Sequence, residues 1–465
     1  MRIVVSQIII ISLLYFDVFE PVVTLLSCYL ALFFGYRKMN LLNPVFWLIG
    51  AWNILFINAC SGVITYKYYI SLENPILFSI SLILVFLAGF YIHNWIHKHR
   101  FIEVKQNKFI LFLKNVGLKK IEITIAKQYT IFSILAALLF FIEIVFIYGG
   151  NILAPSLLRE TFSMRQATLL SQLSGLFFFG GLFSLTAFIF FRSLDNKTFY
   201  LIGIFAFSFG SILSAGRQMV FQLIVASILC LSILKYYKLK VSLLKIHKTY
   251  FLIAIFFISA YFIFISTART SLTKGDTRTK LEIYSAMNNS EFSEDFVTIM
   301  DNTPSVVEDF LVDYLFYFSH EIYLFSEWWT YEDINLIDNH VLRFSPFLER
   351  QIDRLGIFGE TQQKRYERLQ NSYNKGTIIK QGWPTTNKES LVNIGYLGTF
   401  LLVFLHGFFS NKLYLMILSK PSFGLLNLCI ANNIILFNTI SNSAFSETQI
   451  MVYIFVSLYL TYKNI

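Results

Sequence analysis

Long runs of apolar residues follow one another along most of this chain. A helix needs roughly 17–25 apolar residues to cross a bilayer, and most of the runs have about that length. Only helices and closed barrels satisfy their backbone groups in hydrocarbon, and long unbroken runs indicate helices. We predict about twelve membrane spans, near residues 3–16, 21–36, 45–64, 75–93, 128–148, 171–191, 198–213, 218–234, 249–267, 391–410, 423–440 and 450–462.

A single long polar segment separates the ninth predicted span from the tenth. It covers residues 268–390, with nine spans before it in 1–267 and three after it in 391–465. Inside it, residues 310–329 are aromatic and apolar but contain four ionisable side chains. A span with four such groups is energetically costly, so we predict an amphipathic helix that lies on the membrane surface. Alternatively, this segment crosses the membrane, which would invert the last three spans. The four side chains are Asp313, His320, Glu321 and Glu327.

The positions of lysine and arginine orient the predicted spans. Outside 268–390, 21 basic residues fall on one side of the membrane and 4 on the other. Short loops rich in lysine and arginine stay in the cytoplasm. Both ends of the chain are therefore expected in the cytoplasm, and residues 268–390 are expected outside it.

The composition agrees with lipid as the main solvent. The chain is 56% hydrophobic and only 14% charged, whereas soluble domains are about 25% charged. The net charge of +10 does not indicate a nucleic-acid partner, because 268–390 is acidic, with 13 Lys/Arg and 19 Asp/Glu. The excess basic residues lie in short loops, where anionic lipid and topology explain them. All four cysteines fall in apolar runs, which indicates buried thiols.

Arg217 is a candidate for binding an anionic group at the outer membrane boundary. It lies in the sequence SAGRQ at 214–218, which breaks the apolar stretch 198–234 and allows a tight turn. A guanidinium is a planar, always charged fork that suits phosphate oxygens. Alternatively, Arg217 reaches to lipid headgroups without a specific role. The same side holds four further arginines that would add to a cationic patch: Arg159, Arg165, Arg269 and Arg278.

Three residues are candidates for accepting a proton in a reaction. His320 lies beside a carboxylate, as a general base would, although a lone histidine on such a segment is more often structural. Glu143 lies inside a predicted span, where an ionisable group is a functional candidate or a structurally paired one. Glu389 follows Thr386 and Asn387, two loop residues that are candidates for binding sugar hydroxyls.

Asparagines inside the predicted span 423–440 are candidates for joining helices. They are Asn432, Asn433 and Asn438. Amide side chains form hydrogen bonds between helices in membranes. We expect the three asparagines to hold this span to its neighbours.

Several motifs of enzyme chemistry are absent from the sequence. It contains no GxxxxGK[ST] loop, no HExxH, no paired CxxC and no GxSxG. We therefore expect no cofactor and no bound metal. No internal repeat is evident, which weakens the interpretation as a transporter built from duplicated halves.

These features resemble the Wzy-type O-antigen and capsule repeat-unit polymerases of bacterial inner membranes. The resemblance covers nearly the whole chain, in architecture more than in sequence. It rests on the many spans, the single long outer segment, and the motifs LNP at 42–44, SAGR at 214–217 and NIGYLG at 393–398. It implies an all-α, polytopic membrane protein with one large periplasmic loop, similar in layout to GT-C glycosyltransferases.

The resemblance also implies a reaction. A growing chain would move from its undecaprenyl-diphosphate carrier to the non-reducing sugar of a fresh lipid-linked oligosaccharide repeat unit, as in O-antigen (lipopolysaccharide) or capsule synthesis. Because the lipid diphosphate leaves, cations must stabilise the developing negative charge. Arg217 would hold the diphosphate with help from the other outer arginines. One of the three candidate proton acceptors would take the proton of the acceptor hydroxyl.

Partners and location follow from the same resemblance. The protein would lie in the bacterial inner membrane, with the bilayer and the lipid-linked oligosaccharide as its contacts. A chain-length regulator and a flippase of the same pathway are the protein partners that the resemblance implies. No nucleic acid is expected.

Other functions fit part of the pattern. The related O-antigen ligases share the layout, but their long loop commonly ends in a histidine–asparagine pair, and GWPTTN at 382–387 has no histidine. A lipid-linked oligosaccharide flippase or transporter would account for the spans but not for the outer segment of 123 residues. A non-enzymatic scaffold would explain none of the boundary arginines.

Overall fold

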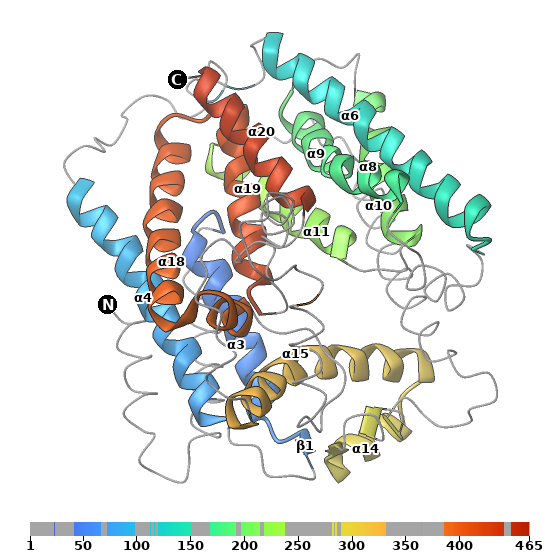
Figure 1. The fold of residues 1–465 in the computed structure, drawn as a ribbon, viewed down its shortest axis with the longest axis vertical. Coiled ribbons are helices and arrows are strands. Elements are labelled where there is room, and N and C mark those ends of the chain that lie inside the picture. Colours follow the sequence, from blue (N-terminus) through green and yellow to red (C-terminus); the bar gives the residue numbers. More distant parts are fainter. Residues whose placement is uncertain are drawn as a thin grey trace. The chain divides into compact units, whose positions relative to one another are not determined.

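The described part of the chain, taken from a computed structural model, is built mostly of helices (Figure 1). The structure describes residues 41–66, 72–97, 120–150, 168–191, 197–213, 218–237, 290–331, 386–440 and 448–464, and single positions at 23, 112, 116, 281, 282, 284, 285 and 364. The chain divides into two compact units, each made of segments that are distant in sequence. Unit 1 comprises 1–97, 277–412 and 435–447, and unit 2 comprises 98–276, 413–434 and 448–465.

Five helices in the described residues are long and apolar enough to cross a membrane, and each overlaps a predicted span. The chain is therefore a helical membrane protein, as the sequence predicted. Three shorter apolar helices, Pro44–Cys60, Lys197–Leu213 and Phe423–Asn438, overlap three more predicted spans. The predicted spans 3–16, 21–36 and 249–267 lie outside the described residues, apart from Val23. The five long helices are Glu73–Ile96, Lys120–Ile147, Leu173–Phe190, Met219–Tyr236 and Ser390–Ser419.

Unit 1 combines membrane helices with the described part of the long polar segment. The strand β1 (Ile64–Tyr66) pairs antiparallel with β2 (Ser290–Phe292), so the long segment returns to the end of α3 (Pro44–Cys60). After β2 come α14 (Glu294–Asp301) and α15 (Ser305–Tyr331). In Figure 1, α15 lies across α3 and α4 (Glu73–His97), and it packs against both.

Capping residues at the start of α3 and a glycine after its last turn set the two ends of this helix. The side chain of Asn43 accepts a hydrogen bond from the backbone N–H of Val45 at 3.0 Å, and Pro44 occupies the first turn, where no N–H is needed. The helix stops at Cys60, and Gly62 follows with a φ of 72°. The predicted span 45–64 is thus too long, because its last residue belongs to β1.

The helix α18 (Thr386–Ser419) is kinked at Gly395, which has a φ of 68°, a value that favours glycine. Its residues up to Lys412 belong to unit 1. A Cβ on Gly407 would lie 2.1 Å from the carbonyl oxygen of Phe86, so the backbones of α18 and α4 are in contact. The predicted span 391–410 is too short at both ends. Polar residues beyond it are satisfied inside the protein, as where the Asn411 amide donates to the carbonyl of Phe90 at 2.8 Å.

Unit 2 is a second helical bundle. Its helices approach one another closely at glycines, which have no side chain. A Cβ on Gly180 would lie 2.0 Å from the carbonyl oxygen of Tyr129, and one on Gly203 would lie 2.4 Å from Ser184 Oγ. The elements are α6 (Lys120–Phe141), the π-helical η2 (Ile142–Ile147), α8 (Leu169–Phe177), α9 (Gly180–Phe190), α10 (Lys197–Leu213), α11 (Gln218–Tyr236), α19 (Phe423–Asn438) up to Ile434, and α20 (Thr448–Asn464).

Asn427 joins three helices of unit 2. Its Oδ1 accepts hydrogen bonds from the hydroxyl of Thr186 in α9 at 2.9 Å and from the hydroxyl of Tyr453 in α20 at 2.6 Å. Asn433, by contrast, donates to the carbonyl of Cys429 in its own helix at 2.9 Å. The prediction that Asn433 joins helices is therefore wrong, and Asn427 does this instead.

Candidate functional site

The five arginines predicted to bind an anionic headgroup lie outside the described residues. The described helices on either side of Arg217 are α10, which ends at Leu213, and α11, which begins at Gln218, and the predicted turn between them lies outside the described residues. The position of Arg217 at the outer boundary stays a prediction. The other four are Arg159, Arg165, Arg269 and Arg278.

The polar residues at the end of the long segment form the first turn of α18. The side chains of Thr386 and Glu389 lie outside the described part of the structure. Asn387 is buried, and its amide donates a hydrogen bond to Ser79 Oγ in α4 at 3.0 Å. In this structure Asn387 joins α18 to α4, and its side chain is not open to a sugar.

The predicted helix over 310–329 is confirmed as part of α15, but its charges face the protein. Its four ionisable side chains are only 0–2% exposed. The large side chains that α15 exposes are apolar or aromatic, Phe310 at 39% and Tyr314 at 38% among them. Burying a charged group is costly unless it is paired or hydrogen-bonded. The surface that α15 leaves open therefore suits an apolar environment better than water. The four ionisable residues are Asp313, His320, Glu321 and Glu327.

His320 lies in a stack of aromatic rings that links the long segment to β1. Its ring lies 4.3 Å from that of Phe316 on one side and 6.4 Å from that of Tyr66 on the other. Tyr284 extends the stack, with its ring 4.2 Å from Phe316, and Tyr323 closes it, with its ring 4.2 Å from Tyr66.

Polar contacts hold both ends of this stack. The hydroxyl of Tyr284 donates to Asp313 Oδ1 at 2.6 Å. The hydroxyl of Tyr323 donates to the carbonyl of Ala59 in α3 at 3.0 Å. In the middle, the hydroxyl of Tyr66 lies 2.9 Å from His320 Nδ1.

Tyr66 is held in its protonated form. Burial raises the pKa of Tyr66 well above its ordinary value, and Tyr323, Glu327 and Glu321 raise it further. A neutral Tyr66 can donate its proton to Nδ1 of His320, which places the imidazole proton on Nε2. His320 is thus fixed inside the protein by Tyr66, an arrangement typical of a structural histidine.

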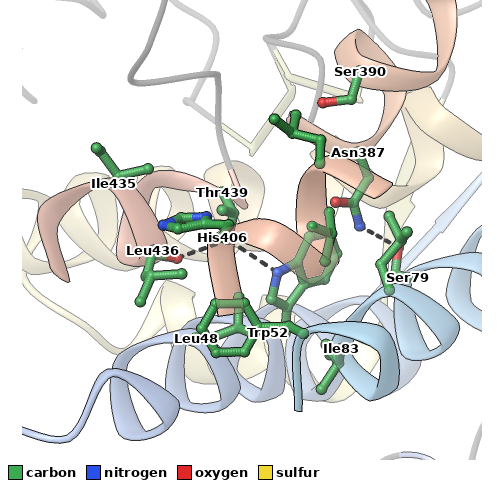
Figure 2. Close-up of a pocket in the computed structure, with 14 residues that line it drawn as sticks. Leu48, Trp52, Ser79, Ile83, Asn387, Ser390, His406, Ile435, Leu436 and Thr439 are labelled. Atoms are coloured by element: carbon green, nitrogen blue, oxygen red, sulfur yellow. Dashed lines mark hydrogen bonds between the residues drawn. The ribbon is translucent and has the colours of Figure 1, made fainter. Parts of the chain in front are cut away.

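A small cavity lies in unit 1 between α3, α4, α18 and the end of α19 (Figure 2). Its volume is about 60 Å³. One water needs about 10–15 Å³ of such space, so the cavity suits a few water molecules and not a sugar. At one side, the indole N–H of Trp52 donates to Thr439 Oγ1 at 3.0 Å. His406 also lines the cavity and packs edge-on against Phe86, with 5.7 Å between ring centroids.

Glu143 belongs to unit 2. It lies in η2, is fully buried, and accepts a hydrogen bond from the hydroxyl of Thr168. Single π-helical turns occur often at functional sites. His320 and Glu389 belong to unit 1, so the three predicted proton acceptors do not share one unit.

Two residues of the stack had no local sequence signal. Tyr66 and Tyr284 belong to no recognisable motif, and only their contacts with His320 and Asp313 show that they meet α15. His406 had a weak signal, since it is the one histidine in the predicted span 391–410. Its position beside a cavity depends on the kink of α18 and was not predictable.

Comparisons add no further identification. Among the described residues, no group of three His, Cys, Asp or Glu side chains is arranged to hold a metal ion. The thiols of Cys60, Cys230 and Cys429 are buried. No family model, no curated protein and no solved structure matches this chain.

Proposed function

We propose that this chain is a membrane glycosyltransferase with about twelve spans and a layout like that of GT-C enzymes. It polymerises undecaprenyl-diphosphate-linked oligosaccharide repeat units into O-antigen or capsular polysaccharide at the periplasmic face of the inner membrane. The observation that carries this proposal is the attachment of the long segment to the membrane helices. β2 pairs with β1, and α15 packs against α3 and α4.

This attachment supports an enzyme that works at the membrane boundary. Two lipid-linked substrates meet where the bilayer ends, so catalytic groups must be held at that level. A segment that formed a separate water-soluble domain would not meet this need. The hydrogen bonds of Tyr66 and Tyr323 hold α15 beside α3 instead.

The proposed roles follow from charge and burial. Arg217 binds the lipid diphosphate and stabilises the leaving group, with the other outer arginines beside it. Glu389 is the proton acceptor we favour, because it lies in the first turn of α18 at the end of the outer segment. His320 and Glu143 are both almost fully buried and hydrogen-bonded, so they suit structural roles better.

Deletion of the gene, followed by gel analysis of surface glycan, tests the function. We expect a ladder of chain lengths to collapse to single repeat units, and plasmid-borne wild type to restore the ladder. Polymer that accumulates on its lipid carrier would indicate a ligase. Repeat units that accumulate on the cytoplasmic side would indicate a flippase. An unchanged ladder would contradict every one of these enzymatic or transport functions.

A further inference from the structure

A groove of about 560 Å³ lies between α6 and α20 in unit 2. Ile125 and Tyr129 line it from α6, and Phe455, Val456 and Tyr459 line it from α20. The volume falls in the range of about 300–1,000 Å³ that is typical of sites for small molecules.

The groove opens between two apolar helix faces. On α6, the exposed residues Ile131, Leu135 and Leu138 are 45–52% accessible and follow the i, i+4, i+7 spacing of one helix face. On α20, Phe455 and Tyr462 are 54% and 77% exposed. Since α6 belongs to a candidate membrane span, its exposed apolar face is suited to contact lipid chains.

Positive charge marks one end of the groove. Lys120 is exposed and directly precedes Ile121, which lines the groove. Lys463 lies one turn beyond Tyr459, with its Nζ 5.9 Å from the centroid of the Tyr459 ring.

The negative charge of α6 is turned away from the groove. Glu122 is the one acidic residue in the sequences of α6 and α20. It is fully buried, and its Oε1 accepts a hydrogen bond from the backbone N–H of Phe423 at 3.3 Å, at the start of α19. The carboxylate of Glu122 therefore does not face the groove that Lys120 and Lys463 flank.

A polar side chain of α6 lies between the charged end and Ile125. Thr124 lines the groove and is exposed. At about 1.5 Å per residue, it lies roughly 6 Å along the helix from Lys120, directly before Ile125. This order of cation, hydrogen-bonding group and apolar surface matches the phosphate, ester and acyl parts of a phospholipid.

We propose that this groove binds an anionic glycerophospholipid. Its phosphate lies at Lys120 and Lys463, and one acyl chain runs along Ile125, Phe455 and Val456. The charge pattern of the sequence assigns this end to the cytoplasmic leaflet, whose anionic lipids attract basic side chains. The site does not depend on the proposed glycan reaction, which takes place at the opposite face.

Native mass spectrometry of the purified full-length protein tests this site. Phosphatidylglycerol and phosphatidylethanolamine with the same acyl chains are titrated separately, and we expect phosphatidylglycerol to be retained more strongly. Lys120→Gln and Lys463→Gln should each lower its relative affinity about fivefold, since one basic residue near a membrane surface contributes about that factor. Lys197→Gln is the matched control, because Lys197 lies in α10 over the ring of Phe188, and it should change nothing.

A second variant separates the groove from surface charge. Val456→Trp places a larger side chain in the groove and should reduce retention of both lipids, whereas Lys463→Arg should keep the preference for phosphatidylglycerol. Thermal unfolding identifies any variant that fails to fold, and the remaining variants still decide the outcome. Equal retention of the two lipids by the wild type, or an unchanged preference in both lysine-to-glutamine variants, would overturn the proposal.

Discussion

The hydroxyl of Tyr66 lies 2.9 Å from Nδ1 of His320, which is 254 residues further along the chain. The contact joins the strand that follows α3 to the helix α15 of the long segment. The ring of Tyr323 lies against Tyr66, and its hydroxyl donates to Ala59 in α3. These contacts fix the long segment to the membrane helices of unit 1.

Removal of the Tyr66 hydroxyl should weaken this attachment. Tyr66→Phe takes a hydrogen-bond partner from a buried histidine, which should lower the free energy of unfolding by about 1–3 kcal/mol. Thermal unfolding of the purified protein in detergent measures the change. Tyr462→Phe is the control, because Tyr462 is 77% exposed. The same unfolding midpoint in both variants would show that Tyr66 does not anchor the segment.

The raised pKa of Tyr66 predicts a specific response to alkaline pH. Burial, followed by Tyr323, Glu327 and Glu321, raises this pKa, so the folded protein holds the Tyr66 proton more tightly than the unfolded chain. The resulting stability is present below the unfolded pKa of about 10 and is lost as the pH rises toward the folded pKa. The stability advantage of the wild type over Tyr66→Phe should therefore shrink above about pH 10. A constant difference between about pH 9 and about pH 11, roughly one unit either side of that value, would argue against a Tyr66 that burial holds in its protonated form.

The contact between α4 and α18 should not tolerate a methyl group. A Cβ on Gly89 would lie 2.1 Å from the carbonyl oxygen of Phe404, and a backbone atom cannot move aside easily. Gly89→Ala should therefore destabilise unit 1 by about 1–3 kcal/mol. Gly50→Ala in α3 is the matched control, since nothing lies within 4 Å of its added Cβ. Alanine favours a helix over glycine by about 1 kcal/mol, so the control should unfold at the same temperature or a higher one.

Asn427 should contribute more to the stability of unit 2 than Asn433, which lies in the same helix. Asn427→Leu removes the acceptor shared by Thr186 and Tyr453. Hydrogen bonds between membrane helices contribute about 0.6 kcal/mol on average and up to about 1.7, so we expect a loss of about 1–3 kcal/mol. Asn433→Leu removes a bond within one helix and should cost less in the same unfolding assay. The reverse order would contradict the role of Asn427.

The sequence predicted the helices better than their ends or their contacts. Length and apolar character locate a span, so the predicted spans 75–93 and 218–234 agree with helices of the structure. The ends failed where polar residues find partners inside the protein, as Asn411 does with Phe90. A single sequence shows that a residue is polar, but not whether the folded protein supplies a hydrogen-bond partner for it.

The same reason limits what the sequence showed of α15. Its ionisable residues predicted an amphipathic helix on the membrane surface, because charged groups are costly inside a membrane. The structure buries Asp313 and His320 against tyrosines from other parts of the chain. Only tertiary pairing, beginning with β1 and β2, brings these residues together. The arginine site stays a prediction from the charge distribution of the sequence, whereas the buried support of α15 could not be predicted from it.

The measurement that tests the central claim most directly is the glycan ladder made by Arg217 variants in a strain lacking the gene. Arg217→Ala should abolish the ladder at normal protein levels, because the leaving lipid diphosphate loses its cation. Arg217→Lys should restore it only in part, since lysine keeps the charge but not the planar fork. Arg192→Ala is the control, as the charge pattern places Arg192 on the cytoplasmic side, and it should restore the full ladder. A full ladder with Arg217→Ala would contradict the account.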